Sequence, residues 1–138
     1  MTQTIFIEGH ITPKGRPRFY VNNGQVRTYT PTETVSYENW VRTCWKEQGG
    51  KMYGDEAQLG VVITAAFPIP KSTPKYRKQM MLDDKIRPIR RPDADNIAKV
   101  VLDSLVGVAY RDDSQVVNLT VQKIYADKEV VCMTIWEV

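Results

Sequence analysis

A nine-residue apolar run, LGVVITAAF at positions 59–67, constrains the fold more than any other segment of this chain. Gly60 and Pro68 bound it, and its length suits a strand better than a helix. A strand that alternates between apolar and polar side chains buries one face, whereas a nearly continuous apolar run is typical of a strand covered on both faces. The segment therefore predicts a strand in the interior of a layered structure.

Other strand signals surround this run. Thr4–Glu8 alternates between apolar and polar residues. Positions 18–29 predict a β-hairpin, because the Asn-Gly pair at 23–24 supplies the positive φ values that a two-residue turn needs. Two further alternating strands are predicted at 115–125 and 129–138, joined by a polar turn.

The first predicted helix begins at TPTE, with Thr30 as N-cap, Pro31 as the first helical residue and Glu33 closing a capping box. It ends at the glycine pair 49–50. The residues expected on its buried face recur at a spacing of three or four: Tyr37, Val41, Cys44, Trp45 and Gln48.

Two more helices are predicted before the last strands. STPKYRKQMM begins with Ser72 as a cap and favours a short basic helix. A second helix is expected from about Asn96 to Val106, ended by Gly107. Its buried stripe is expected to contain Ile97, Val100, Val101 and Leu105.

This order of elements predicts an α+β fold: one domain over residues 1–138, with a mostly antiparallel mixed sheet and helices packed on one face. A chain of this length is able to bury a core. No apolar run is long enough to span a membrane, and no signal peptide is expected. Cys44 and Cys132 lack metal-type spacing, so we expect reduced thiols in a cytoplasmic protein with no membrane partner.

The charge is unevenly distributed. Positions 68–91 contain eight basic residues and only two acidic ones, and a smaller basic group lies in PKGRPRF at 13–19. A single charged run usually forms a solvated surface. Two basic segments leading up to an acidic motif favour a polyanionic partner. The basic residues expected to bind phosphates are Lys14, Arg16, Arg18, Lys71, Lys75, Arg77, Arg90 and Arg91.

The acidic motif is RPDADN at 91–96. Pro92 favours extended backbone before the following helix, so Asp93 and Asp95 are expected to point the same way, toward the positive end of that helix. Lys99 lies one turn after Asp95 on the same helical face. Asp103 lies about 12 Å beyond Asp95, too far to share an ion with it, and is expected to pair with Lys99.

A third carboxylate is available in YRDDSQ, as Asp112 or Asp113. The chain after the helix is long enough to double back and place one of them beside Asp93 and Asp95. Carboxylate oxygens suit Mg²⁺ or Mn²⁺, which could activate water and stabilise the leaving oxygen of a phosphodiester. The alternative is that the aspartates only cap a helix and that RDD forms a turn. Spacing alone leaves both interpretations open.

Other chemistries are excluded by missing residues. The register of an EF-hand starting at Asp93 is broken, and the chain has no phosphate-binding glycine loop, no His-Glu-x-x-His and no cysteine pair. His10 is the only histidine, so a serine or cysteine nucleophile would lack its base. Metal-assisted phosphate chemistry beside a basic surface remains, with no nucleotide cofactor.

The segment RRPDADNIAKVVLDSLVGVAYRDDSQVV at 90–117 resembles the signature of the RusA family of Holliday junction resolvases, endodeoxyribonucleases common in prophages. The resemblance combines Asp-x-Asp-Asn, a lysine four residues later, Leu-Asp-x-Leu and Asp-Asp-x-Gln-Val. It implies that Asp93, Asp95 and Asp113 are catalytic, metal-coordinating acids and that Lys99 is the catalytic lysine.

The resemblance also implies a homodimer that makes paired, symmetric nicks in a four-way DNA junction with Mg²⁺, in a bacterial or phage-infected cell. A two-fold protein suits a branch with two-fold pseudo-symmetry. One alternative is a phage protein that binds branched DNA without cutting it. Another is a metal-dependent nuclease that acts on flaps, forks or RNA hybrids, which would share the same site.

Overall fold

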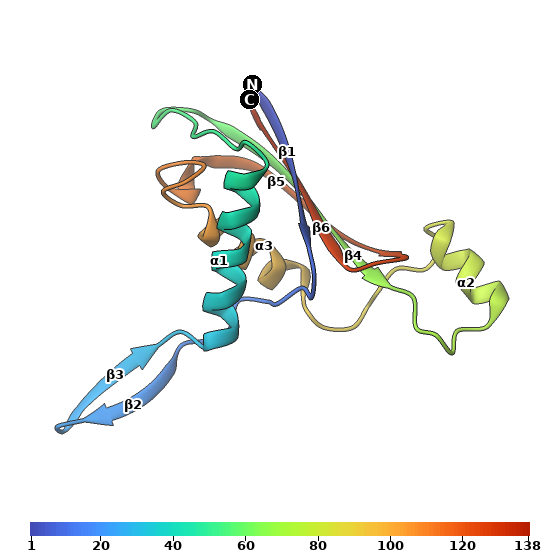
Figure 1. The fold of residues 1–138 in the computed structure, drawn as a ribbon, viewed down its shortest axis with the longest axis horizontal. Coiled ribbons are helices and arrows are strands. Elements are labelled where there is room, and N and C mark those ends of the chain that lie inside the picture. The colour runs from blue at the N-terminus through green and yellow to red at the C-terminus, as the bar shows by residue number, and fades with distance from the viewer.

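The computed structural model, which describes residues 1–138, has an α+β fold built on one mixed four-stranded sheet (Figure 1). In spatial order the strands are β1 (Thr2–Glu8), β6 (Val130–Glu137), β4 (Leu59–Pro68) and β5 (Val116–Ala126). β6 is antiparallel to β1 and β4, whereas β5 is parallel to β4. The predicted α+β class with a mostly antiparallel mixed sheet is therefore confirmed.

Two helices pack on one face of the sheet, namely α1 (Thr32–Glu47) and α3 (Ala94–Ser104). Complete burial of one large aliphatic side chain contributes about 1.5–3 kcal/mol relative to exposure, so the shared core holds these helices in place. The predicted stripe of α3 is confirmed as buried. The core side chains between the helices and the sheet include Ile5, Ile7, Val41, Trp45, Ile63, Ile97, Val101, Met133 and Ile135.

The opposite face of the sheet carries no helix (Figure 1), yet Gly60 and Ala66 of β4 are buried there, so the expectation that β4 is covered on both faces is met only in part. Leu59, Val61 and Ile63 are fully buried toward the helices, but Val62 on the other face is only half-buried. Trp136 of β6 covers part of this second face, where a Cβ atom on Gly60 would lie 2.4 Å from its ring. The run is apolar for two reasons: β4 lies in the middle of the sheet, between β5 and β6, and the helices cover one of its faces.

A second sheet consists of only two strands, β2 (Arg18–Asn22) and β3 (Gln25–Tyr29), which project from the body of the molecule (Figure 1). The predicted hairpin turn is confirmed, with φ values of 50° at Asn23 and 75° at Gly24. Every residue of the two strands is exposed. The hairpin therefore leaves its side chains available to a partner.

The helix starts differ from the sequence expectations. Pro31, with φ −55° and ψ 144°, occupies the cap position of α1 in place of Thr30, and no side chain caps the helix. Pro74 does the same for α2 (Lys75–Leu82), so Ser72 is not its cap. Proline has no N–H group to leave unsatisfied at such a position. Gln48 is the exposed member of the predicted stripe of α1, and its side-chain amide bonds the backbone of β1.

The last two strands are consecutive in the chain but are not neighbours in the sheet, because β4 lies between them. The parallel pairing of β4 with β5 depends on contacts between distant segments, which no local pattern specifies. None of the helices has the length and apolar character needed to cross a lipid bilayer.

Candidate active site

The acidic motif lies at the start of α3. Asp93 is the N-cap residue, with an extended backbone at φ −70° and ψ 148°, whereas Asp95 already belongs to the first helical turn. The expectation that both aspartates lie on extended backbone is therefore wrong for Asp95. Residues two apart on a helix do not face each other, so Asp95 shares its face with Lys99 instead. Both aspartates are exposed.

The chain before this motif is held by a lysine that sequence reasoning missed. Lys123 of β5 donates hydrogen bonds from Nζ to the carbonyl oxygens of Arg90 (2.6 Å) and Pro92 (2.9 Å). The Arg91–Pro92 peptide bond is cis. The sequence contained a signal for this role. Lys123 comes two residues after Val121, so it lies on the face of the strand that packs against the core.

A loop from the amino-terminal third completes the surroundings of the motif. A hollow of about 350 Å³ is lined by Arg16 of this loop, by Arg91 and Pro92, and by Asp93 and Asn96 at the start of α3. These segments are far apart in the sequence, yet they place two arginines beside a carboxylate and an amide. Arginine side chains of this kind can bind phosphate oxygens in a bidentate manner.

A neighbouring hollow of about 280 Å³ is lined by Lys14, Arg16, Asn96 and Lys99. The loop rests directly on α3, because the backbone N–H of Lys14 donates to the carbonyl oxygen of Asn96 (3.4 Å). The fold thus brings the predicted Lys99 together with two of the predicted phosphate-binding residues.

Lys14 makes ion pairs of its own. Its Nζ lies 3.4 Å from a carboxylate oxygen of Glu38 on α1 and 3.4 Å from one of Asp103 on α3. The expected pairing of Asp103 with Lys99 is therefore wrong, because the loop delivers a closer cation from a distant part of the chain. Lys99 is exposed and makes no ion pair, so its ammonium group is available to a ligand.

The two candidates for the third acid have different surroundings. Asp112 is exposed and accepts a hydrogen bond from the Ser114 hydroxyl (2.6 Å), which lowers the pKa of its carboxyl. Asp113 is half-buried. The pKa of the Asp113 carboxyl is raised, mainly by burial and to a lesser extent by the negative charges of Asp103 and Asp112. Asp113 is thus the member of the pair that faces α3.

Gln115 fixes the loop that carries these two acids. Its side-chain oxygen accepts hydrogen bonds from the backbone N–H groups of Arg111 (3.0 Å) and Asp112 (3.2 Å). Its amide nitrogen donates to the carbonyl oxygens of Gly54 (2.9 Å) and Ala57 (3.1 Å). The glutamine of the Asp-Asp-x-Gln-Val pattern is therefore a positioning residue, a role that the pattern alone does not reveal.

The structure contains no group of three His, Cys, Asp or Glu side chains close enough to hold a metal ion together. It therefore does not gather Asp93, Asp95 and Asp113 as expected, and the charges that act on Asp113 are those of Asp103 and Asp112. The helical backbone at Asp95 is one reason, since it turns that side chain away from the direction of Asp93. The assignment of these three aspartates as metal ligands stays a prediction.

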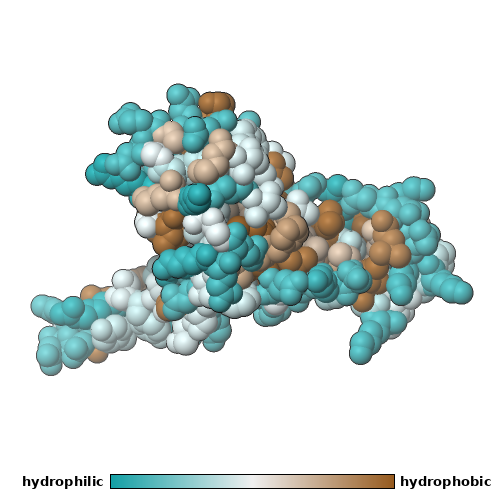
Figure 2. All heavy atoms as spheres, turned by 45° about the horizontal axis from the view of Figure 1, so that its top comes forward, coloured by the Kyte–Doolittle hydropathy of each residue, from teal (hydrophilic) through white to brown (hydrophobic).

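Three of the remaining predicted phosphate-binding residues lie toward the two ends of the molecule. Arg18 belongs to the hairpin, whereas Lys75 and Arg77 belong to α2 at the opposite end (Figure 1). Figure 2 shows hydrophilic side chains gathered on both projecting lobes, with apolar surface between them. Apart from Lys14, none of the eight predicted residues makes an ion pair, so their positive charges are not neutralised within the chain.

The start of α3 thus combines carboxylates, an unpaired lysine one turn later and flanking arginines. These are residue types that can bind and polarise phosphates, as in nucleases. Comparison with known families specifies the class further. Residues 8–135 match the family model described as endodeoxyribonuclease RusA, and the chain belongs to this family of DNA endonucleases, which acts on branched DNA junctions. The chain is also 31% identical over 134 residues to YqaN of Bacillus subtilis (strain 168), a protein described as uncharacterized; the match covers 96% of this chain and 94% of YqaN.

Proposed function

We propose that this protein is a Mg²⁺-dependent, structure-selective endonuclease that resolves Holliday junctions by paired symmetric nicks, in DNA recombination and repair. Its expected location is the cytoplasm of a bacterial or phage-infected cell. The observation that carries the proposal is the hollow beside Asp93, where Arg16 and Arg91 meet the start of α3. In this hollow, guanidinium groups that can bind phosphates lie close to carboxylate oxygens that can bind a metal ion.

The arginines and the lysine have distinct roles in this proposal. Arg16 and Arg91 bind phosphates of the DNA backbone and hold the strand against the start of α3. Lys99, on the face of α3 that also carries Asp95, donates hydrogen bonds to the phosphate that is cut and stabilises its developing negative charge. The basic side chains on the hairpin and on α2 add affinity that depends on salt but not on sequence.

Asp93, Asp95 and Asp113 are the residues that would hold Mg²⁺, with Mn²⁺ able to replace it. Their donor atoms are hard oxygens, and Mg²⁺ is commonly held by only one or two carboxylates, with waters and substrate phosphates completing its shell. The residues therefore fit the ion even though the structure does not gather three carboxylates. The ion would activate water and stabilise the leaving oxygen.

Cleavage of a synthetic four-way junction tests this function directly. The protein is incubated with the junction, and separately with a linear duplex of the same arms, in Mg²⁺ and in EDTA. We expect symmetric paired nicks in the junction alone, lost in EDTA and restored by Mn²⁺. Tight binding without nicks in either metal would favour a non-catalytic protein that binds branched DNA. Faster cutting of flaps, forks or RNA hybrids would assign the same site to a different substrate.

We further propose that the protein acts as a homodimer and that β5 forms the contact. At the other edge of the sheet, the Gln48 side chain bonds the N–H (2.9 Å) and the carbonyl (2.7 Å) of Phe6, which blocks pairing of β1. β5 is an open edge with Val117 59% exposed and Leu119 43% exposed, and such edges pair readily with another chain. Asp113 lies just before β5, so this contact would place one site on each side of the two-fold axis.

Replacing Leu119 by lysine is expected to convert the dimer to a monomer, because a charge would be buried at the strand edge. Light scattering after size exclusion should give twice the 15.8 kDa chain mass for the unmodified protein and the single chain mass for Leu119→Lys. Val21→Lys, at an exposed position of the hairpin, is the matched control and should remain dimeric. A dimeric Leu119→Lys variant would refute β5 as the contact.

A further inference from the structure

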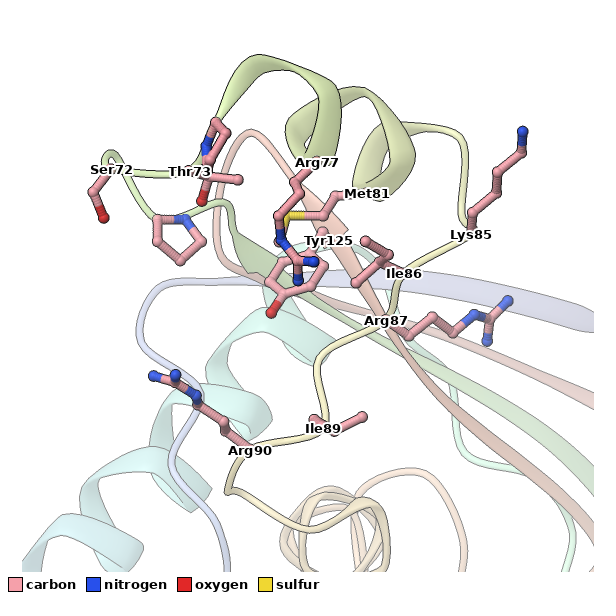
Figure 3. A pocket seen from close by; sticks show the side chains of 12 residues that line it. Ser72, Thr73, Arg77, Met81, Lys85, Ile86, Arg87, Ile89, Arg90 and Tyr125 are labelled. Carbon is pink, nitrogen blue, oxygen red and sulfur yellow. The ribbon is translucent and has the colours of Figure 1, made fainter.

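A further hollow of the molecule lies outside the site described above. Its volume is about 690 Å³, within the range of about 300–1,000 Å³ typical of pockets for small organic groups. It lies between α2 and β5, and Figure 3 shows Tyr125 of β5 at its centre with Arg77 and Met81 of α2 above the ring. We call it the Tyr125 cavity.

All the charged side chains that line the Tyr125 cavity are positive. Its lining contains four cations and no acidic residue. Arg87 is neutralised, because its guanidinium donates to both carboxylate oxygens of Asp84, at 2.9 and 2.5 Å. Arg77, Lys85 and Arg90 make no ion pair. Unpaired cations gathered at one hollow repel one another, and an anionic ligand would relieve that repulsion.

Apolar side chains also line the cavity. Met81 is 6% exposed, and Ile86 lines the cavity together with the Tyr125 ring. Ile89, which also lines the cavity, is 95% exposed, although large aliphatic side chains are usually buried. An aromatic ring with apolar neighbours and nearby arginines is a combination suited to nucleotides, since bases stack on the ring while the arginines bind phosphates.

The Tyr125 cavity is connected to the candidate active site through the chain. Arg90 lines the cavity, and Arg91 and Asp93 line the hollow at the start of α3. Lys123, on the same face of β5 as Tyr125, bonds the carbonyl oxygens of Arg90 and Pro92 and so holds the two hollows in a fixed relation. A DNA strand bound at the start of α3 could therefore continue into the cavity.

We propose that the Tyr125 cavity is a nucleotide subsite that accepts one unstacked base of the DNA strand near the phosphate to be cut. The base stacks on Tyr125, and its flanking phosphates contact Arg77 and Arg90. A base inside a linear duplex is stacked on both sides and cannot enter, whereas branch points present bases that unstack easily. The subsite thus selects branched over linear DNA. This inference rests on the proposed action on branched DNA.

The test is a binding experiment in EDTA, which separates the subsite from cleavage. Tyr125→Leu keeps an apolar side chain at this position but removes the ring, and is expected to raise the Kd for a four-way junction about 10-fold while changing the Kd for linear duplex less than two-fold. Tyr125→Phe should retain junction affinity. Tyr76→Leu, which removes a tyrosine that is 68% exposed and lies outside the cavity, should bind as the unmodified protein does.

A fluorescent base analogue gives a readout that altered folding would not reproduce. With 2-aminopurine placed in turn at positions around the branch, we expect a binding-induced fluorescence change at one position that is lost in Tyr125→Leu and kept in Tyr125→Phe. If Tyr125→Leu does not fold, Arg77→Gln on the surface of α2 is the second variant, expected to weaken junction binding several-fold more than duplex binding.

Three outcomes would overturn the inference. One is an equal effect of Tyr125→Leu on junction and duplex binding, and another is no effect on either. The third is tight binding of a free deoxynucleoside monophosphate that does not compete with the junction, which would make the cavity a site for a free nucleotide. A protein that binds junctions through Tyr125 but never cuts them would refute the proposed endonuclease function and leave the subsite standing.

Discussion

Asp95→Asn is expected to abolish junction cleavage while leaving junction binding intact or tighter. Losing one ligand of a catalytic metal removes several kcal/mol of transition-state stabilisation, and about 4 kcal/mol corresponds to a roughly 10³-fold slower rate. Asparagine has nearly the same size and carries no charge, so the phosphates of the DNA meet less repulsion at the start of α3. Rates of nicking in Mg²⁺ and Kd values in EDTA measure the two effects separately.

Asp127→Asn is the matched control for this substitution. Asp127 is exposed in the turn between β5 and β6 and does not line the hollows at the start of α3, so the same change there removes a negative charge outside the candidate site. Its cleavage rate should remain within about two-fold of the unmodified rate, since isolated surface changes have small effects. Cleavage by Asp95→Asn at the unmodified rate would show that the metal-site assignment is wrong.

The adjacent pair Asp112 and Asp113 provides a second expected result of similar size. Asp113→Asn is expected to lower the cleavage rate at least about 100-fold, as the loss of a metal-binding carboxylate should. Asp112→Asn should stay within about three-fold, because Asp112 is exposed and its carboxylate accepts a hydrogen bond from Ser114 within its own turn. Single-turnover nicking rates of the two variants measure the difference directly.

The midpoint of thermal unfolding shows whether a variant has lost activity because it is less stable. Burial, followed by the charges of Asp103 and Asp112, raises the pKa of the Asp113 carboxyl, so its charged form is unfavourable in the folded state at neutral pH. A neutral asparagine should therefore maintain or raise the midpoint of Asp113→Asn. Equal rate losses in both variants would show that the two acids act together, and a larger loss in Asp112→Asn would reverse their assignment.

Local sequence patterns predicted the elements that depend on local physics. The hairpin followed from Asn23-Gly24, where positive φ values are needed whatever the surroundings. The buried stripe of α3 followed from its apolar spacing. The helix starts were less predictable, because Pro31 and Pro74 can occupy cap positions in which a hydroxyl residue was expected. These differences change the helix ends and leave the elements themselves intact.

The candidate site was predictable in its residue types but not in its geometry. Asp93, Asp95, Lys99 and the pair 112–113 were singled out by their spacing and by the resemblance to the RusA family, and their roles stay predictions. Their directions depend on where α3 begins, and a shift of two residues placed Asp95 on a helix instead of extended backbone. A helix start is decided by small energies, which the surrounding contacts can override.

The sequence by itself determined the strands, the helices, the acidic motif and the basic segments, because each depends on residues that are near one another in the chain. Only the tertiary structure decided that β4 separates β5 from β6, that Lys14 pairs with Asp103, and that Lys123 holds the approach to α3. These contacts join residues 30 to 90 positions apart. Their free energy comes from burying a shared core, which belongs to the whole chain and to no single segment of it.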